Sequence, residues 1–176
     1  MTLAEFRRTY PTTTFTVSGG KPFTYRYYQN PLAEATLVLL TGGIGLSDLF
    51  YKHFARFAGD FSVLTFDYQI QFGDNGEFAD AVAELLHCLK EKAWLVGQSL
   101  GGVVAQIIAA RHPEVVEGLV LSNTCSLSGS MSETGYQDLM KMIESQRKFK
   151  KWLAFLPFPL IKRMMRWAVM KKKTDG

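Results

Sequence analysis

Short apolar runs recur along the chain, and segments with the spacing of amphipathic helices separate them. Four runs are almost wholly apolar, at residues 36–41, 61–66, 93–97 and 118–122. Uninterrupted runs of this length are typical of strands that are covered on both faces, as in a parallel sheet. We therefore expect parallel strands at these four positions.

The segments that separate these runs predict helices, because their large apolar residues recur every three or four positions. They are residues 47–58, 74–89 and 100–111. The last of them is apolar nearly all round, which predicts burial against the sheet. This alternation of strands and helices predicts the α/β class, with a mostly parallel sheet and crossover helices on both faces.

An antiparallel hairpin is predicted ahead of the first apolar run. Residues 13–17 and 23–28 alternate between polar and apolar or aromatic side chains, with Ser18-Gly19-Gly20-Lys21 between them. Such an alternation around a glycine-rich turn is typical of two paired strands.

The pattern changes after Asn123. Residues 126–135 are rich in serine and glycine, and two segments with helical spacing follow. The boundary at about residue 125 divides the chain into an α/β core, residues 1–125, and a helical segment, residues 126–176.

The charge of the chain is concentrated near its end. Residues 147–176 hold ten Lys and Arg and a single acidic residue, whereas residues 1–146 hold ten basic and fifteen acidic residues. The net charge of +4 is thus a property of the tail, and it gives no reason to expect nucleic-acid binding. Two interpretations of the tail stay open: helices that cap a pocket, or a surface for a membrane or an acidic partner.

Targeting and cofactor signals are missing from the sequence. The first eleven residues lack the apolar stretch of a secretory signal, and no stretch approaches the roughly 20 apolar residues that span a bilayer. Cys88 and Cys125 form neither a disulfide framework nor a CxxC metal motif. We expect a cytoplasmic protein with no integral membrane segment, metal or cofactor.

The candidate chemistry centres on Gly97-Gln98-Ser99-Leu100-Gly101, a G-x-S-x-G motif between a predicted strand and a predicted helix. A serine in this context sits on a turn so tight that side chains two residues away on either side would clash, which accounts for both glycines. The turn presents the Ser99 hydroxyl as a nucleophile beside the positive end of the next helix. The alternative is a helix start at which Ser99 is the N-cap.

A second glycine-rich turn, residues 41–45 (TGGIG), follows the first apolar run. The backbone N–H of Gly43 in this turn can stabilise the same oxyanion as the N–H of Leu100. Two nucleotide-binding motifs do not fit, because a Walker loop needs a lysine here and a dinucleotide fingerprint needs a third glycine. A merely flexible turn is the other alternative.

Three segments resemble the α/β-hydrolase superfamily from its third to its sixth strand: TLVLLTGGIG (36–45), FSVLTFDYQ (61–69) and AWLVGQSLGGVVAQIIAARHPEVVEGLVLSN (93–123). The resemblance covers about residues 13–125, and the spacing looks most similar to that of maspardin-like proteins and small bacterial relatives. It implies Ser99 as the nucleophile, the Gly43 and Leu100 amides as the oxyanion hole, and a helical cap from about residue 127.

The sequence departs from the family's pattern in three ways. Thr41-Gly42 stands where many members have His-Gly, and Asn123 stands where an aspartate sometimes serves as the acid. The family also supplies its acid after a later strand and its histidine after the last one, and the 176 residues contain neither strand. None of the three histidines fits as the base; His112, for example, ends the helix that begins at Ser99, about 20 Å away.

We therefore expect a fragment of a serine hydrolase that acts on an ester, amide or thioester bond of a small molecule and is inactive as this chain alone. The alternative is a non-catalytic binding or adaptor protein of the same fold. Because a sheet that ends after the fourth run exposes one long edge and half an apolar face, we also expect the chain to self-associate or to borrow strands from another chain. Asp67 is expected to have a structural hydrogen-bonding role, and Cys125 to be a buried small hydrophobe.

Overall fold

The computed structural model of the chain describes residues 1–69, 71–127 and 145. The chain divides into two compact units, residues 1–131 and 132–176, and nearly all of the second unit lies outside the described residues. The helical segment predicted within residues 126–176, with its basic tail, therefore lies outside them as well.

The described residues form α-helices, two 3-10 helices (η) and strands. In chain order these are α1 (Leu3–Thr9), β1 (Thr13–Thr16), β2 (Pro22–Tyr28), β3 (Thr36–Leu40), η1 (Ser47–Phe50), α2 (Tyr51–Phe57), β4 (Ser62–Phe66), α3 (Asn75–Leu89), β5 (Ala93–Gln98), α4 (Leu100–Arg111), η2 (Pro113–Val115) and β6 (Val116–Ser122).

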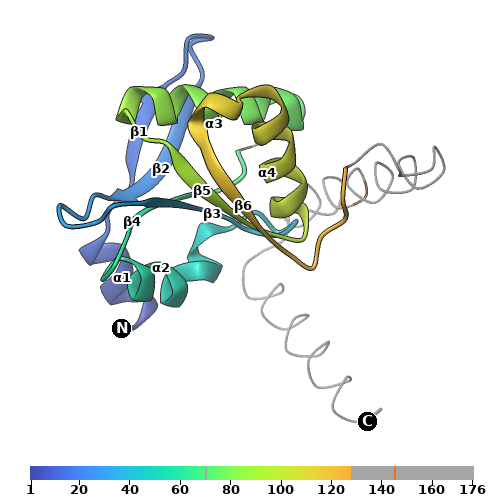
Figure 1. Cartoon of the computed structure of the whole chain (residues 1–176). Coiled ribbons are helices and arrows are strands. Elements are labelled where there is room, and N and C mark those ends of the chain that lie inside the picture. Colours follow the sequence, from blue (N-terminus) through green and yellow to red (C-terminus); the bar gives the residue numbers. More distant parts are fainter. Residues whose placement is uncertain (70, 128–144, 146–176) are drawn as a thin grey trace. The chain divides into compact units, whose positions relative to one another are not determined.

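One six-stranded sheet organises the described part of the chain, in the order β1-β2-β4-β3-β5-β6 (Figure 1). β1 pairs antiparallel with β2, and β2 pairs antiparallel with β4. β4, β3, β5 and β6 are parallel to their neighbours. The predicted hairpin and the four predicted parallel strands are thus confirmed, in a mostly parallel sheet.

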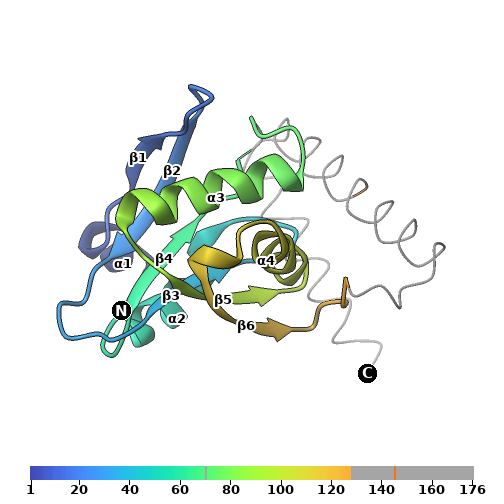
Figure 2. The ribbon, with the colours of Figure 1, turned by 45° about the horizontal axis from the view of Figure 1, so that its top comes forward.

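Helices lie on both faces of this sheet, as predicted. α3 and α4 lie against one face, and α1 and α2 lie on the other (Figures 1 and 2). α3 and α4 begin and end within one residue of their predicted bounds; α3 has a regular apolar spacing, and α4 is apolar nearly all round. The single helix predicted over residues 47–58 is instead the 3-10 turn η1 followed by α2.

The short helix α1 was not predicted, although its N-terminus carries a recognisable signal. The Thr2 side chain accepts a hydrogen bond from the Glu5 backbone, and the Glu5 side chain accepts one from the Thr2 backbone, a capping box. The buried face of α1 is Phe6, which packs edge-on against Phe54 of α2 with 5.3 Å between ring centroids. A helix of two turns depends on such tertiary packing more than on its own propensity.

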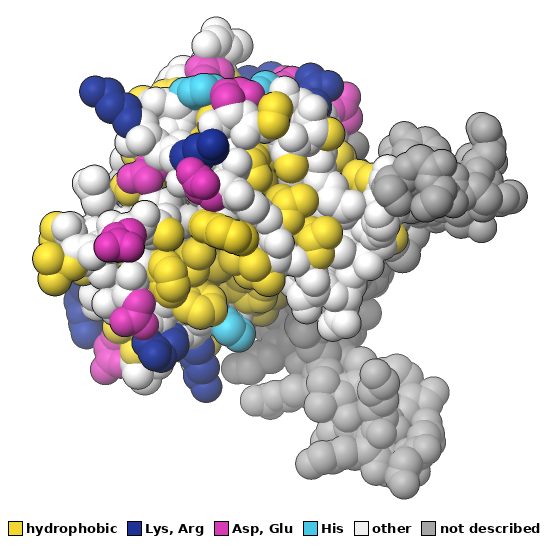
Figure 3. Space-filling view, viewed as in Figure 1, with side chains coloured by type: hydrophobic (Ala, Val, Ile, Leu, Met, Phe, Trp, Pro, Cys, Tyr) yellow, Lys and Arg dark blue, Asp and Glu magenta, His cyan; other side chains and the backbone are white. Residues whose placement is uncertain are grey.

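Coverage of the sheet is uneven: the prediction of burial on both faces is correct for β3 and β4, and the predicted exposed half of an apolar face lies at β5 and β6. β3 and β4 are buried along their whole length, but β5 alternates and β6 is mostly exposed among the described residues. Trp94 is 41% exposed and Val120 is 48% exposed. Figure 3 shows apolar side chains gathered on the surface between α2 and the strands β5 and β6.

This exposed area has a simple geometric origin. The register pairs Trp94 with Gly118 and Val96 with Val120, so these residues share one face of the sheet. α1 and α2 pack on that face at β3 and β4, where Val96 of β5 also contacts their cluster, and no described helix covers Trp94 and Val120. The apolar character of β5 and β6 thus suits a covered sheet, whereas the described residues cover only the α4 side.

Two further findings concern the described residues only. No helix among them is long and apolar enough to cross a membrane. Cys88 and Cys125 are both free thiols.

Candidate active site

Ser99 lies at the junction between β5 and α4 with a backbone conformation that is unusual for a residue with a side chain. Its φ is 54° and its ψ is −120°. A non-glycine residue in this region carries a strain of about 1–3 kcal/mol, which the surrounding structure has to overcome. Ser99 occupies the N-cap position, but its side chain makes no capping hydrogen bond. A capping serine has an extended backbone and an accepting hydroxyl, so Ser99 stands at the start of α4 without capping it through its side chain.

The glycines of the motif make this turn feasible, as the sequence predicted. A Cβ added to Gly97 would lie 2.5 Å from the Gly101 carbonyl oxygen. A Cβ added to Gly101 would lie 2.1 Å from the Leu40 carbonyl oxygen. Both distances are far below van der Waals contact, so the close approach of α4 to β3 and β5 requires glycine at both positions.

Backbone hydrogen bonds fix Ser99 on both sides of its peptide. Its N–H donates to the Ser122 carbonyl oxygen at 2.9 Å, which extends the pairing of β5 with β6. Its carbonyl oxygen accepts from the Gly102 N–H at 2.9 Å and from the Val103 N–H at 3.4 Å. The same oxygen accepts a third hydrogen bond, from the Thr124 hydroxyl at 2.8 Å.

The glycine-rich turn after β3 lies directly beside Ser99. A Cβ added to Gly42 would lie 3.5 Å from the Ser99 Cβ and 2.9 Å from the Gln98 Oε1. The backbone N–H of Gly43, the next residue, donates to no other described residue, and neither does that of Leu100. Leu100 begins the twelve-residue helix α4, whose N-terminus carries a partial positive charge. The geometry therefore brings together Ser99 and the turn that contains Gly43.

Tyr68 holds this turn in place. Its hydroxyl donates to the Thr41 carbonyl oxygen at 2.6 Å, and its N–H donates to the Gly45 carbonyl oxygen at 2.9 Å. Burial raises the pKa of the Tyr68 hydroxyl, so the group stays protonated and able to donate at neutral pH. Gly45 has a φ of +64°, and a Cβ there would lie 2.7 Å from the Tyr68 Cβ.

None of the three histidines makes a hydrogen bond to Ser99. His112 follows the last residue of α4, with its Nε2 2.7 Å from an Asp80 carboxylate oxygen. His87 Nε2 lies 3.4 Å from a Glu114 carboxylate oxygen. His53 is on α2 and packs against Phe50, with 5.3 Å between the ring centroids. The contacts of all three histidines thus involve residues other than Ser99.

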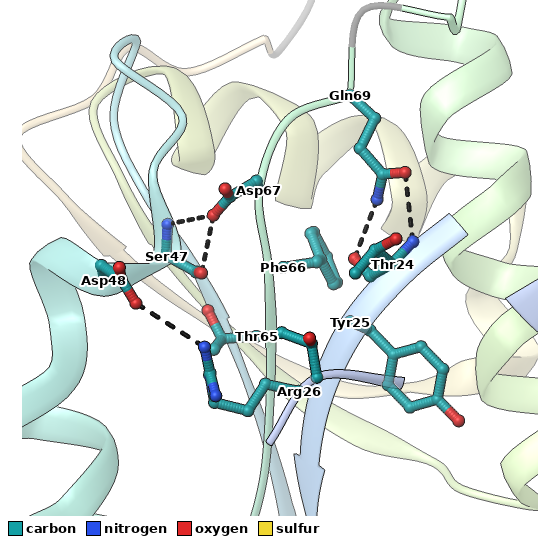
Figure 4. A pocket seen from close by; sticks show the side chains of 10 residues that line it. Thr24, Tyr25, Arg26, Ser47, Asp48, Thr65, Phe66, Asp67 and Gln69 are labelled. Carbon is teal, nitrogen blue, oxygen red and sulfur yellow. Dashed lines mark hydrogen bonds and ion pairs between the residues drawn. The ribbon is translucent and has the colours of Figure 1, made fainter. Parts of the chain in front are cut away.

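Asp67 has the structural role predicted for it. One of its carboxylate oxygens accepts from both the backbone N–H and the hydroxyl of Ser47, each at 2.7 Å. The contact anchors the start of η1 to the end of β4 (Figure 4).

A cavity of about 230 Å³ adjoins Asp67 between β2, β4 and η1 (Figure 4). All of its lining residues except Phe66 carry a polar side-chain group; they are Thr12, Thr24, Tyr25, Arg26, Ser47, Asp48, Thr65, Phe66, Asp67 and Gln69. Ser99 and the turn after β3 do not line it. This cavity is therefore separate from the predicted site.

The buried cation of the cavity is Arg26, whose side chain is only 6% exposed. Its guanidinium lies 3.7 Å from an Asp48 carboxylate oxygen and stacks over the Phe6 ring at 4.7 Å. Burial lowers the pKa of Arg26, and Asp48 partly offsets the effect. Asp48 also accepts hydrogen bonds from Arg7, so the group ties α1 and β2 to η1. No cluster of three or more metal-ligating side chains occurs in the described part of the chain.

A family assignment follows from the sequence around this site. Residues 35–169 match the profile of the alpha/beta hydrolase fold. The chain belongs to the α/β hydrolase fold family. The resemblance inferred from the motifs is thus confirmed at the level of the family, whereas the narrower maspardin-like similarity stays a prediction.

Two curated proteins similar to this α/β hydrolase are RutD proteins, each named as a proposed carbamate hydrolase. The one from Agrobacterium fabrum is 28% identical over 123 residues, which are 64% of this chain and 47% of that protein. The one from Pantoea ananatis is 28% identical over 122 residues, 61% of this chain and 43% of that protein. The chain thus spans about half the length of the curated relatives it matches.

Solved structures give the same fold. A hydrolase from Pseudomonas aeruginosa is 22% identical, with a TM-score of 0.61 over 87% of this chain and 62% of that one. The esterase RhEst1 from a Rhodococcus species is 26% identical, with a TM-score of 0.59 over 70% of this chain and 50% of that one. Both support the fold derived above.

Three residues around Ser99 were not found from the sequence: Tyr68, Gln106 and Thr124. Each acts through a hydrogen bond to a backbone group that is distant in sequence. The sequence signal for Tyr68 is that it is a polar residue close after a predicted strand, and this signal does not identify its hydrogen-bond partner.

Proposed function

We propose that this protein is a serine hydrolase in which Ser99 attacks the carbonyl carbon of a small-molecule ester, amide or thioester. The observation that supports this most is the strained backbone of Ser99, whose hydroxyl caps no helix and stands beside a glycine-rich turn. Strain of this kind is concentrated at functional sites, because a structural serine has no need of it.

In the proposed reaction the Ser99 Oγ forms a bond to the carbonyl carbon, and its proton passes to a general base. The carbonyl oxygen becomes an oxyanion, which the Gly43 and Leu100 N–H groups stabilise together with the positive end of α4. The base returns its proton to the leaving group as this intermediate collapses, which releases the alcohol, amine or thiol and leaves an acyl-serine. Water then hydrolyses the acyl-serine to the carboxylic acid and restores the Ser99 hydroxyl. Similarity to proteins named as carbamate hydrolases and esterases places carbamates among the carbonyl substrates to be tested.

The proposed mechanism needs a base and an acid, and we assign both to a segment outside the 176 residues. Two observations support the assignment. The three histidines all lie in the described residues and make contacts away from Ser99. The chain also spans 47% and 43% of the two curated relatives. Without a base the serine hydroxyl is a poor nucleophile, so we expect the chain alone to be inactive.

A fluorophosphonate probe tests the proposal on the protein expressed from its complete open reading frame. We expect covalent labelling of Ser99, located by peptide mass spectrometry, and loss of the label in Ser99→Ala. A Ser122→Ala variant is the control, since Ser122 contributes only its carbonyl oxygen to the site. A protein that folds but leaves Ser99 unlabelled would instead support the second candidate.

The second candidate is a non-catalytic binding protein that keeps the fold. It is favoured by the exposed apolar face around Trp94 and Val120, which offers a surface to a partner chain. In that case the strained turn at Ser99 between β5 and α4, called the elbow below, is retained because it lets α4 pack closely against β3.

A further inference from the structure

The segment that leaves β6 folds back onto the N-terminus of α4 and touches Ser99. Asn123, the first residue after β6, has a φ of 47°. Asparagine is among the few residues that adopt this left-handed conformation readily. The turn directs Thr124 back toward the start of α4, where its hydroxyl donates to the Ser99 carbonyl oxygen at 2.8 Å.

This hydrogen bond differs from the others that Ser99 makes. The donors Gly102 and Val103 belong to the first turn of α4, so they are present wherever a helix follows. The Thr124 hydroxyl comes from a residue 25 positions away and makes the shortest of the three bonds. It is therefore the one restraint on the Ser99 carbonyl that the local helix cannot provide.

Gly102 shows that the chain leaves room for Thr124 at this position. A Cβ added to Gly102 would lie 2.5 Å from Cγ2, 2.6 Å from Cβ and 2.7 Å from Oγ1 of Thr124. The G-x-S-x-G turn itself requires glycine only at positions 97 and 101. The third glycine is explained by Thr124, which packs where the side chain of residue 102 would otherwise be.

Gln106, one turn further along α4, fixes the rest of the segment. Its Nε2 donates to the Gly102 carbonyl oxygen at 3.0 Å and to the Cys125 carbonyl oxygen at 2.8 Å. Its Oε1 accepts from the Leu127 N–H at 2.8 Å. The backbone on both sides of Ser126 is therefore bound to α4 through a single half-buried amide.

We propose that Thr124 is a positioning residue for Ser99, and that Gln106 acts through Thr124 by holding residues 125–127 against α4. The inference rests on the proposed function of Ser99 as the nucleophile. The φ and ψ angles of Ser99 set the direction of its Cα–Cβ bond, and the Thr124 hydroxyl restrains the peptide that defines ψ. A displacement of the nucleophile by about 1 Å reduces the rate about 100-fold, so a loosened elbow is costly for catalysis.

The test compares Thr124→Val, which keeps the shape but not the hydroxyl, with Thr124→Ser, which keeps the hydroxyl. The first readout is the rate of fluorophosphonate labelling of Ser99 in the protein from the complete reading frame. We expect Thr124→Val to label about 10-fold more slowly, and Thr124→Ser to label within about threefold of the wild type. Thr14→Val, which removes a hydroxyl on the distant strand β1, serves as the control and is expected to match the wild type.

The second readout does not depend on activity, so it separates failure of this inference from failure of the proposed function. Amide hydrogen exchange of Gly102 and Val103, which also bind the Ser99 carbonyl, reports on opening of the elbow. We expect exchange about fivefold faster in Thr124→Val, near-normal exchange in Thr124→Ser, and no change at Leu39 of β3. If the probe does not label the wild type but the variants show this exchange pattern, the proposed function is wrong, whereas the role of Thr124 in positioning the Ser99 backbone stands.

Either of two results would overturn the inference. One is that Thr124→Val exchanges its amides and labels Ser99 at the wild-type rates. The other is that Thr124→Val and Thr124→Ser are impaired to the same extent in both measurements. Gln106→Met keeps the length of the side chain and removes its three hydrogen bonds. It provides an independent arm if Thr124→Val does not fold. We expect this variant to accelerate amide exchange at Gly102 and Val103. Exchange at the wild-type rate would show that Gln106 does not contribute to positioning Ser99.

Discussion

A side chain on Gly101 would meet the carbonyl oxygen of Leu40 at 2.1 Å, so α4 touches the end of β3 with no room for even a methyl group. The contact places the N-terminus of α4 beside the glycine-rich turn that follows Leu40. The same close packing brings the strained serine and the turn with Gly43 together.

The first prediction concerns this contact. Gly101→Ala is expected to lower the free energy of unfolding by about 3 kcal/mol, because the added methyl group overlaps backbone that cannot move aside without disturbing β3. Urea denaturation followed by circular dichroism measures the loss. Gly19→Ala is the matched control, since a Cβ there meets nothing within 4 Å. Equal stability of the two variants would contradict the packing described here.

The second prediction concerns backbone strain at Ser99. Ser99→Gly and Ser99→Ala both remove the hydroxyl, but only glycine adopts a φ of 54° without strain. The relief of strain exceeds the entropy that glycine adds to the unfolded chain, so Ser99→Gly should be about 1 kcal/mol more stable than Ser99→Ala. Urea denaturation of the pair provides the comparison. The opposite order would mean that Ser99 is relaxed.

The third prediction concerns Tyr68 and the turn after β3. Tyr68→Phe leaves the Thr41 carbonyl oxygen without its hydroxyl donor, and we expect a loss of about 1 kcal/mol in stability. If the Gly43 N–H serves the oxyanion, labelling of Ser99 by the fluorophosphonate should also slow, by about 10-fold. Tyr25→Phe is the control, because its hydroxyl makes no hydrogen bond to a described residue. Unchanged labelling in a destabilised Tyr68→Phe would separate the turn from the reaction.

The fourth prediction is a pH dependence at the opposite end of α4. A bidentate pair with Arg111, at 2.8 and 2.7 Å, holds the pKa of Asp80 below its ordinary value, and His112 adds to the effect. At a pH between the pKa of Asp80 in the folded protein and its pKa in the unfolded chain, the unfolded chain binds more protons. The stabilisation is therefore complete above the ordinary aspartate pKa and is lost as the pH falls through the lowered value.

Because Asp80 is partly exposed, solvent screening makes its contribution modest. Asp80→Asn should destabilise the protein at pH 6 and have a smaller effect at about pH 3, below the ordinary aspartate pKa, where the stabilisation by wild-type Asp80 is already being lost. Urea midpoints at the two pH values test this. Asp60→Asn, which alters the exposed pair with Arg56, should show a smaller difference. A constant effect of Asp80→Asn at both pH values would contradict the linkage.

The fifth prediction concerns the exposed face of β5 and β6. We expect self-association through Trp94, Val120 and the unpaired edge of β6 among the described residues. Sedimentation velocity of the 176-residue chain should show species heavier than the monomer, and Val120→Lys should raise the fraction of monomer. Thr14→Lys, on the strand at the other edge of the sheet, should leave the distribution unchanged. A monodisperse wild-type monomer would contradict this expectation.

Much of the fold could be predicted because its signals are local. The apolar runs that became β3 to β6 are continuous, and α3 and α4 have regular spacing between turn residues. The spatial order of the strands had no such signal. β4 lies between β2 and β3 because of pairings that join distant segments, such as Tyr25 with Phe66.

The candidate site divides in the same way. Ser99, Gly97 and Gly101 could be found because steric exclusion at a tight turn leaves a pattern of residue types. Thr124 could not, because its position depends on the left-handed backbone of Asn123, and a threonine after a strand has many roles. An exposed half of an apolar face was expected for a sheet that ends after the fourth run, but the residues on it could not be named, since Trp94 and Val120 have the same apolar character whether or not a helix covers them.

The hydrogen bond from the Ser99 N–H to the Ser122 carbonyl has a consequence for the order of folding. The turn at Ser99 gains its bonds to Ser122 and Thr124 only when β6 has paired with β5. That pairing joins residues closer in sequence than the pairing of β3 with β5 does, so its loop-closure cost is smaller. The strained backbone of Ser99 should therefore form together with α4 and β6, and the later docking of β3 would bring the turn that contains Gly43 beside it.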